Sequence, residues 1–437
     1  MLFLLILRVD YAIIFSEVSS TMNLKRKIQF KNGKLKVLQI SDLQDTKNTS
    51  VDTLNFVDDA IEMIKPDFII ITGDQLDVVG LWGKGEKAKK NVEIAIRRLF
   101  SAIEKHNIPY VLTFGNHDRE TGVSNEEQAE IYKTLKNCIC FDDIDDGRPD
   151  VGTFNVPVMS SDGERVALNF FVMDTHSKTK DIGYEGVNDA QLEWYRSVGE
   201  NLKAENGGEF VPSMVFQHIP VSNIMGLFKE APKGTKGAQC DFVKDNKRYW
   251  ILDEEKIFHN YSYGETPSMT LGTKQFDAMK AQGDVFAMYF GHDHYNSFAG
   301  KVDGMDLGYC PGTGYNSYGT KHRAFRVFEF DENDVKNYKT YSLNSKDCKS
   351  KTNAAPLKNS FSYWAPCNPS AAGPFAAKIL SVLIPFVVLL VLVYQFVSAD
   401  FVKGLLLGLV SGGLLYGVIS CIVNKIMRNK LTKNNEV

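Results

Sequence analysis

Short apolar runs and segments of helical spacing alternate along the first part of the chain. The pattern predicts strands at residues 35–40 and 110–114, and the continuous apolar run at residues 67–72 is typical of a buried strand. Residues 51–64 have helical spacing, and residues 87–105 are also predicted to form a helix. Strand–helix alternation favours right-handed crossovers between neighbouring strands. The pattern therefore predicts a mainly parallel sheet.

Beyond residue 153 the apolar runs follow each other more closely. Strands are predicted there at residues 154–159, 166–174, 213–218, 285–290, 305–310 and 324–330, with one helix at residues 188–206. This spacing indicates a second sheet packed against the first, within one α/β domain that covers residues 24–345. Residues 221–270 are rich in Gly, Lys and Tyr, and they are expected to form an irregular loop over a site.

Two C-terminal segments have a different pattern. Residues 379–399 and 404–424 carry no charge, and each is long enough to span a bilayer, which takes roughly 20 residues. A buried globular helix is a poor explanation, because both segments lack a polar face. The pattern predicts two transmembrane helices in a hairpin over residues 376–424, after a linker at residues 346–375 and before a basic tail at residues 425–437.

Basic residues flank the predicted hairpin on both sides. They are Lys351, Lys358 and Lys378 before it, and Lys425, Arg428, Lys430 and Lys433 after it. The positive-inside bias therefore predicts a membrane protein whose α/β domain faces the cytoplasm. Residues 1–23 form a weakly apolar N-terminal extension that resembles a signal peptide poorly, since Arg8 and Asp10 interrupt it and no basic segment precedes it.

Composition narrows the class of protein only slightly. The 437 residues are 44% hydrophobic and 24% charged, which is typical of a folded chain. A net charge of −3 gives no nucleic-acid footprint. The seven cysteines contain no CxxC pair, so a zinc ribbon is disfavoured and free thiols are expected.

Polar side chains follow five of the predicted strands at the point where each strand ends. These residues are Asp42 and Gln44, Asp74, Asn116 and His117, His218, and His292 and His294. Ligands of open α/β sheets bind at the carboxyl ends of strands. One aspartate at such a place is usually a helix cap, and one histidine is usually a core residue. Five positions in this order are poorly explained by caps and turns.

The blocks that carry these residues resemble those of the calcineurin-like metallophosphoesterase superfamily over about residues 35–330. The segments "QHIP", "GHDHYNSFAG" and "YGTKHRAFRVFEF" are similar to the branch related to purple acid phosphatases that lacks the purple chromophore. The resemblance implies a four-layer αββα sandwich with two divalent metal ions at the sheet edges. Such a pair of ions can clamp a phosphoryl group and activate a water.

The resemblance also implies a role for each residue of the site. One ion would be held by Asp42, Gln44, Asp74 and His294, and the other by Asp74, Asn116, His218 and His292. His117 would act as a catalytic residue beside the substrate, and Asp118 would orient its imidazole. Asn116 and His117 are the expected substrate contacts. Arg119 is a further candidate, although an arginine at such a position is more often a surface residue.

Two positions depart from the pattern of the superfamily. Gln44 stands where the first motif usually has histidine, and this neutral oxygen donor favours Mn²⁺ or Mg²⁺ over Zn²⁺ or iron. Asp77 stands where the purple enzymes have a metal-binding tyrosine, so the protein should be colourless. The segment "GTGYNSYG" at residues 312–319 either lines the pocket or forms a turn.

These observations predict an enzyme that acts on phosphorylated substrates and is held at the lipid bilayer by its hairpin. The expected reaction is hydrolysis of phosphomonoesters by metal-bound hydroxide. One alternative is a phosphodiesterase with the same centre. The other is a catalytically weak, membrane-tethered module that binds metal and interacts with partners.

Overall fold

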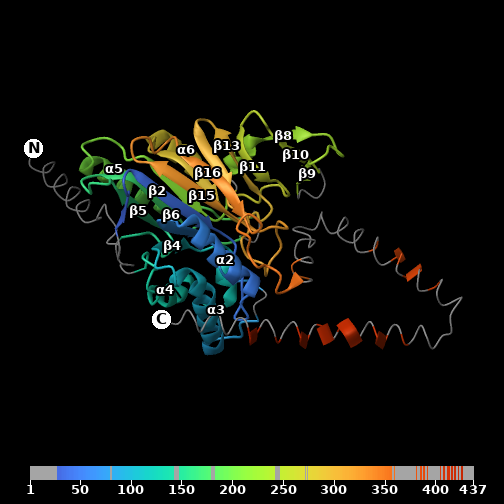
Figure 1. Ribbon diagram of the computed structural model, residues 1–437. Helices are drawn as coiled ribbons and strands as arrows, with labels where there is room; N and C mark the ends of the chain where they lie inside the picture. The colour runs from blue at the N-terminus through green and yellow to red at the C-terminus, as the bar shows by residue number, and fades with distance from the viewer. Residues whose placement is uncertain are drawn as a thin grey trace, which may run out of the picture.

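The computed structural model describes residues 27–356, apart from 79–80, 142–146, 179–182, 242–246, 271 and 273, together with residue 359 and scattered positions between 380 and 426. Two sheets lie face to face in the described part of the chain, and helices cover their outer faces (Figure 1).

The first sheet has five strands in the order β16-β15-β2-β3-β4. Their bounds are β2 (Lys34–Ile40), β3 (Phe68–Thr72), β4 (Tyr110–Thr113), β15 (Ala324–Asp331) and β16 (Lys339–Asn344). Strands β2, β3 and β4 are parallel, with Leu38 opposite Ile69 and Ile70 opposite Val111. Their carboxyl ends therefore meet at one edge of the sheet.

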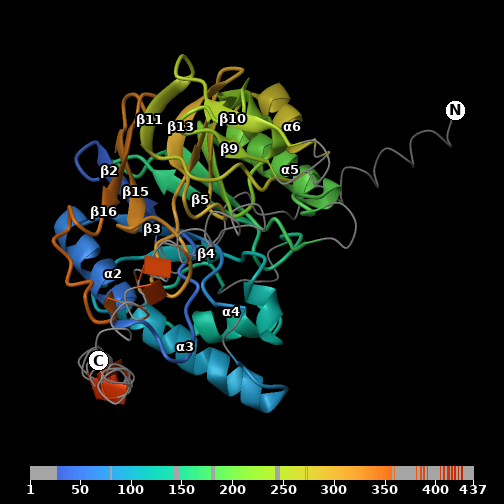
Figure 2. The same cartoon turned by 90° about the vertical axis from the view of Figure 1, so that its right-hand side faces the viewer.

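Three helices cover the outer face of this sheet: α2 (Val51–Ile64), α3 (Glu86–Glu104) and α4 (Asn125–Lys133). Ser50 caps α2, and Ser124 begins α4 with a capping box. Phe56 of α2 packs on Phe325, with ring centroids 4.2 Å apart. Figure 2 shows these helices on the side of the two sheets opposite to α5 and α6.

The second sheet has eight strands in the order β1-β5-β6-β7-β12-β14-β13-β11. They are β1 (Ile28–Gln29), β5 (Phe154–Met159), β6 (Val166–Met173), β7 (Ser213–Gln217), β11 (Ile257–Ser262), β12 (Val285–Phe290), β13 (Ser297–Val302) and β14 (Met305–Tyr309). Helices α5 (Asp189–Glu205) and α6 (Gln275–Gln282) pack on its outer face. Strands β6, β7, β12 and β14 run parallel.

Aromatic side chains fill the space between the sheets. Phe216 and Tyr289 of the second sheet contact Phe328 of the first, with ring centroids 5.4 Å and 4.6 Å apart. Helices, sheet, sheet and helices thus follow one another in four layers, which confirms the predicted α/β sandwich.

The prediction that residues 221–270 form an irregular loop is wrong, because this range contains four strands. A short 3₁₀ helix, η2 (Ser222–Leu227), is followed by a three-stranded sheet of β8 (Phe228–Ala231), β9 (Gln239–Cys240) and β10 (Tyr249–Leu252), and β11 then joins the edge of the second sheet. Most side chains of these strands are exposed or half-buried. Apart from the four residues of β10, these strands contain no continuous apolar run that would have predicted them.

The structure describes only scattered positions of the predicted C-terminal hairpin. Within the described part of the chain, no helix combines the length and the apolar character needed to cross a membrane. Most of residues 379–399, nearly half of residues 404–424 and all of residues 1–23 lie outside the described residues. The start of the predicted linker packs on α2, because the N–H groups of Ala354 and Ala355 donate to the carboxylate of Asp52.

Candidate metal centre

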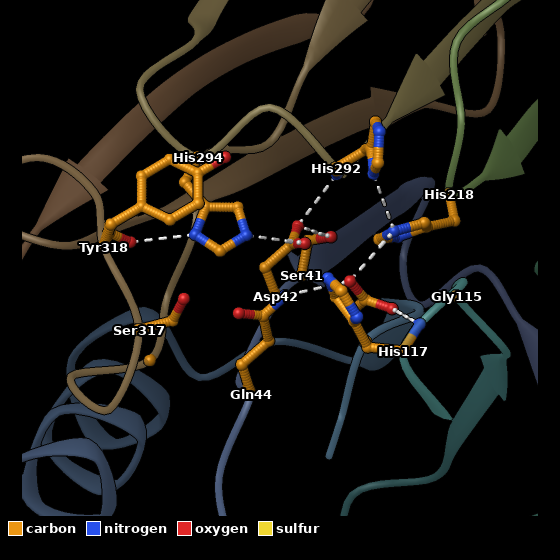
Figure 3. Close-up of polar contacts among 12 residues, drawn as sticks. Ser41, Asp42, Gln44, Gly115, His117, His218, His292, His294, Ser317 and Tyr318 are labelled. Atoms are coloured by element: carbon orange, nitrogen blue, oxygen red, sulfur yellow. Dashed lines mark hydrogen bonds and ion pairs between the residues drawn. The ribbon is translucent and has the colours of Figure 1, made fainter. Parts of the chain in front are cut away.

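The predicted donor residues converge where the two sheets meet. Asp42 and Asp74 follow the parallel neighbours β2 and β3, while His218 and His292 follow the parallel neighbours β7 and β12. The N–H of Asp42 donates to the carbonyl of Gly73, and the N–H of His292 donates to Asp42 Oδ2 at 2.9 Å. Figure 3 shows the side chains from both sheets facing one another.

One group of donors surrounds His218. Its Nε2 atom lies 3.2 Å from each of Asp74 Oδ2, Asn116 Oδ1 and His292 Nδ1. The ligand atoms of Asp74, His218 and His292 are all within 4.8 Å of one another, and the three residues are buried. One ring N–H can satisfy only one of these contacts, and oxygen and nitrogen donors at such spacing are typical of a metal site.

The second group consists of Asp42, Gln44 and His294. His294 Nε2 lies 3.1 Å from Asp42 Oδ1, yet among the described residues this buried oxygen accepts no well-formed hydrogen bond. Gln44 Nε2 donates to Asp74 Oδ2 at 2.9 Å. Asp74 Oδ2 therefore contacts a member of each group, as a carboxylate that bridges two ions should.

The outer ring nitrogens support the same interpretation. His218 Nδ1 lies 2.8 Å from the carbonyl of Thr72, and His294 Nδ1 lies 2.8 Å from the carbonyl of Tyr318. Ligating histidines usually donate their second N–H to such a carbonyl, which directs the other nitrogen to the metal. Two buried carboxylates, three imidazoles and an oxygen without a hydrogen bond fit a pair of divalent cations.

The backbone is strained at four of the predicted ligands. The φ angles are +53° at Asp42, +37° at Gln44, +54° at Asp74 and +72° at His292, where side chains other than glycine each cost about 1–3 kcal/mol. Gly115 allows a close approach, since a Cβ atom there would lie 2.1 Å from Asp74 Oδ1. The Gly-Asp and Gly-Asn pairs of the sequence thus serve one shared geometry.

Burial and charge set the protonation of the two histidines of the first group. Burial, aided by His218, lowers the pKa of His292 to about 3, so this imidazole is neutral. Burial also acts to lower the pKa of His218, but Asp74 and Asp42 raise it to about 10. A cation bound by His218 must therefore displace a proton.

His117 lies at the rim of the donor cluster, and its orienting partner differs from the predicted one. Its N–H donates to Asp74 Oδ1 at 2.8 Å, and its ring Nδ1 lies 2.6 Å from Glu120 Oε2.

Asp118 instead accepts the backbone N–H groups of Asp74, Gly115 and Leu76 at 2.8–3.0 Å. The prediction that Asp118 orients His117 is wrong, because its carboxylate is occupied in holding the backbone of the motif.

Three further residues at the site were not among the predicted set. Glu120 is a turn away from His117 in the 3₁₀ helix η1 (Asp118–Thr121), where such an acid usually makes a surface pair. The Tyr184 ring meets His292 edge-on, with centroids 4.5 Å apart, and Tyr318 stacks on His294 at 4.1 Å. Tyr318 belongs to the segment that the sequence left open between pocket lining and turn.

Arg119 forms an ion pair with the buried carboxylate of Asp174. Asp174 also accepts the N–H of His176 at 2.7 Å. The role of Arg119 as a phosphate contact stays a prediction.

The family model of the calcineurin-like phosphoesterases matches residues 35–296. The chain belongs to this family. The matched range begins in β2 and includes every predicted ligand from Asp42 to His294.

Curated relatives of this phosphoesterase support the predicted branch. The chain is 25% identical over 338 residues to probable inactive purple acid phosphatase 14 of Arabidopsis thaliana, with 69% of this chain and 76% of that one covered. It is 23% identical over 350 residues to phosphatase DCR2 of Saccharomyces cerevisiae, covering 72% of this chain and 55% of the relative. Among solved structures, a dimetal phosphatase from Danio rerio aligns with a TM-score of 0.41 at 11% identity, covering 71% of this chain and 98% of that one.

Proposed function

We propose that this phosphoesterase hydrolyses phosphomonoesters at a dinuclear metal centre, with phosphodiesters as the alternative substrates of the same centre. The observation that carries the proposal is the position of Asp74, whose Oδ2 atom contacts both Gln44 and His218. A buried carboxylate shared by two groups of donors has the geometry that a pair of ions requires.

Seven side chains would hold the two ions. Asp42, Gln44, Asp74 and His294 belong to one position, and Asp74, Asn116, His218 and His292 belong to the other. Two bound ions would offset the negative charge of the phosphate oxygens and would lower the pKa of a water, so that it could lose a proton and attack phosphorus. The oxygen donor of Gln44 favours Mn²⁺ or Mg²⁺ at the first position.

His117 is the candidate proton donor to the leaving group. Its backbone is fixed by Asp74, and Glu120 contacts Nδ1, which leaves Nε2 for the leaving oxygen. A carboxylate beside an imidazole favours the protonated ring, which is the form that a general acid needs. Asp118 supports this arrangement only indirectly, by holding the backbone of Gly115 and Asp74.

The test uses the full-length chain in detergent, freed of metal with a chelator and then supplied with Mn²⁺, Mg²⁺ or Zn²⁺. Turnover of nitrophenyl phosphate and of its bis-ester is measured for the wild type, His117→Ala and the control His106→Ala. His106 contacts Asp58 at 2.8 Å, away from the centre. We expect metal-dependent turnover that falls about 10²- to 10⁴-fold in His117→Ala and is unchanged in the control. The ratio of the two rates identifies the ester class.

A metal-binding module without turnover is the second candidate. Three curated relatives carry names that call them probably inactive, and Gln44 directs its amide N–H toward Asp74 rather than an oxygen lone pair. Stoichiometric metal binding without hydrolysis of either ester would favour this function over the first.

We further propose, from hydropathy and flanking charge, that the C-terminal hairpin anchors the domain to the cytoplasmic face of a membrane. The full-length protein should stay with membranes during alkaline washing. Deletion of residues 376–437 should release the protein from them. Continued membrane association of the shortened chain would contradict the anchor. In the full-length chain, protection of the α/β domain from protease added on the cytoplasmic side would contradict the orientation.

A further inference from the structure

The loop at residues 312–320, between β14 and β15, packs directly against the chain that carries Asp42 and Gln44. The N–H groups of Thr313 and Gly314 donate to the carbonyls of Ser41 and Asp42 at 3.0 Å and 3.1 Å. A Cβ atom at Gly314 would lie 1.8 Å from the carbonyl oxygen of Leu43. The contact is thus made backbone to backbone, with no room for a side chain.

Two residues of this loop hold two of the proposed ligands. Asn316 Nδ2 donates to the carbonyl of Gln44 at 3.2 Å and to Asp77 Oδ2 at 3.0 Å. The Tyr318 carbonyl lies 2.8 Å from His294 Nδ1, and its ring stacks on that imidazole with planes 5° apart (Figure 3). Gln44 and His294 belong to the same metal position, so the loop acts on one side of the centre.

Arg323 fixes the shape of the loop through hydrogen bonds to its backbone. Its guanidinium is almost wholly buried and donates to the carbonyls of Gly314 at 2.8 Å, Ser317 at 2.6 Å and Thr320. The planar fork of arginine can hold three carbonyls at once, which the single ammonium of lysine cannot reproduce. Gly319 leaves room for it, since a Cβ there would lie 2.9 Å from Nη1.

The donors of the other metal position are held by different means. His218 is oriented by the carbonyl of Thr72, and the backbone of His292 is held by Asp42. Neither contact involves the loop.

We propose that Arg323 is a positioning residue which, through Asn316 and Tyr318, sets the affinity of the metal position formed by Asp42, Gln44 and His294 separately from that of the other position. The proposal rests on the dinuclear centre described above. A substitution of Arg323 should therefore weaken one metal position and leave the other unchanged.

The experiment titrates Mn²⁺ into the metal-free, full-length chain in detergent and counts free ion by electron paramagnetic resonance. Wild type, Arg323→Lys, Asn316→Ala and Arg326→Lys are compared. Arg326 is a matched control, because it is also a buried arginine, three positions further along on β15, but donates to the carbonyl of Tyr309 and to Thr340, outside the loop. If Arg323→Lys does not fold, Asn316→Ala decides the outcome.

We expect two bound ions in the wild type. In Arg323→Lys and Asn316→Ala the Kd of one ion should rise about 10- to 100-fold, as for other outer-shell changes, while the other Kd stays within about twofold. Equal weakening of both ions, no weakening, or the same change in Arg326→Lys would overturn the proposal. A wild type that binds fewer than two ions would overturn the centre as well, whereas two ions without turnover would contradict only the catalytic function.

Discussion

The two donor groups of the centre are held in place by different parts of the fold. His218 and His292 follow neighbouring strands of one sheet, and their contacts run to Thr72 and Asp42 at the ends of the facing sheet. Gln44 and His294 depend in addition on a loop that lies between two later strands. The ends of the two sheets position the first group, whereas we propose that the second group can also be altered through residues of the loop.

The largest effect should come from Asp74, the residue that the two groups share. Asp74→Asn removes the bridging charge, so both Mn²⁺ ions should bind more weakly, by more than the about 10- to 100-fold of an outer-shell change. Turnover should be lost at the same time. Mn²⁺ titration and esterase assay measure the effect, and Asp284→Asn is the control for loss of a buried carboxylate. Retention of either ion at wild-type affinity would show that Asp74 does not bridge.

A pair of glycine substitutions separates the two groups. Gly115→Ala would place a Cβ 2.1 Å from Asp74 Oδ1, and Gly314→Ala would place one 1.8 Å from the Leu43 carbonyl. Overpacking of this kind costs about 1–3 kcal/mol of stability. We expect Gly115→Ala to weaken both metal positions and Gly314→Ala to weaken only the position of Gln44 and His294. Chemical denaturation and Mn²⁺ titration test this, and the same metal profile for both variants would contradict the division.

Replacing the ligand that departs from the family pattern should sharpen the difference. Gln44→His supplies an imidazole, which suits Zn²⁺ better than an amide oxygen does. The affinity of one position for Zn²⁺ relative to Mn²⁺ should rise by at least about tenfold, or ~1.4 kcal/mol, while the other position is unchanged. Competition titrations with the two metals measure the ratio. An unchanged ratio would mean that residue 44 is not a ligand.

The last prediction concerns stability, through a buried carboxylate outside the centre that should leave both metal positions unchanged. Burial raises the pKa of Asp284, which accepts a hydrogen bond from Tyr195, to about 6. Its contribution to stability is therefore present below about pH 4 and is lost as pH rises toward 6. Asp284→Asn should gain up to about 3 kcal/mol over the wild type at pH 7, relative to their difference at pH 4. Denaturation at the two pH values tests this, and parallel curves for the two proteins would exclude the shift.

Much of the sandwich was predictable, because β3 and β12 are almost entirely apolar and β2 and β6 are mainly apolar, and most side chains of these strands are buried. The edge elements were not predictable in the same way. Strand β11 alternates half-buried with exposed positions and so lacks such a run. Burial on both faces, rather than strand formation itself, is what the hydrophobic pattern detects.

The donors of the centre could be predicted because they follow those buried strands directly. The residues that orient them could not. Asp118 is adjacent to His117 in sequence, but the tight turn directs its carboxylate to the backbone of Asp74, and Glu120 reaches the ring instead. Tyr318 contacts His294 across 24 positions of sequence, a contact that only the packed loop defines.

The most direct test of the account is to follow turnover of nitrophenyl phosphate while Mn²⁺ is titrated into the metal-free, full-length chain. We expect two bound ions per chain and an activity that appears only as the second ion binds. Full activity with one ion, or two bound ions without hydrolysis of nitrophenyl phosphate, would contradict the proposed function.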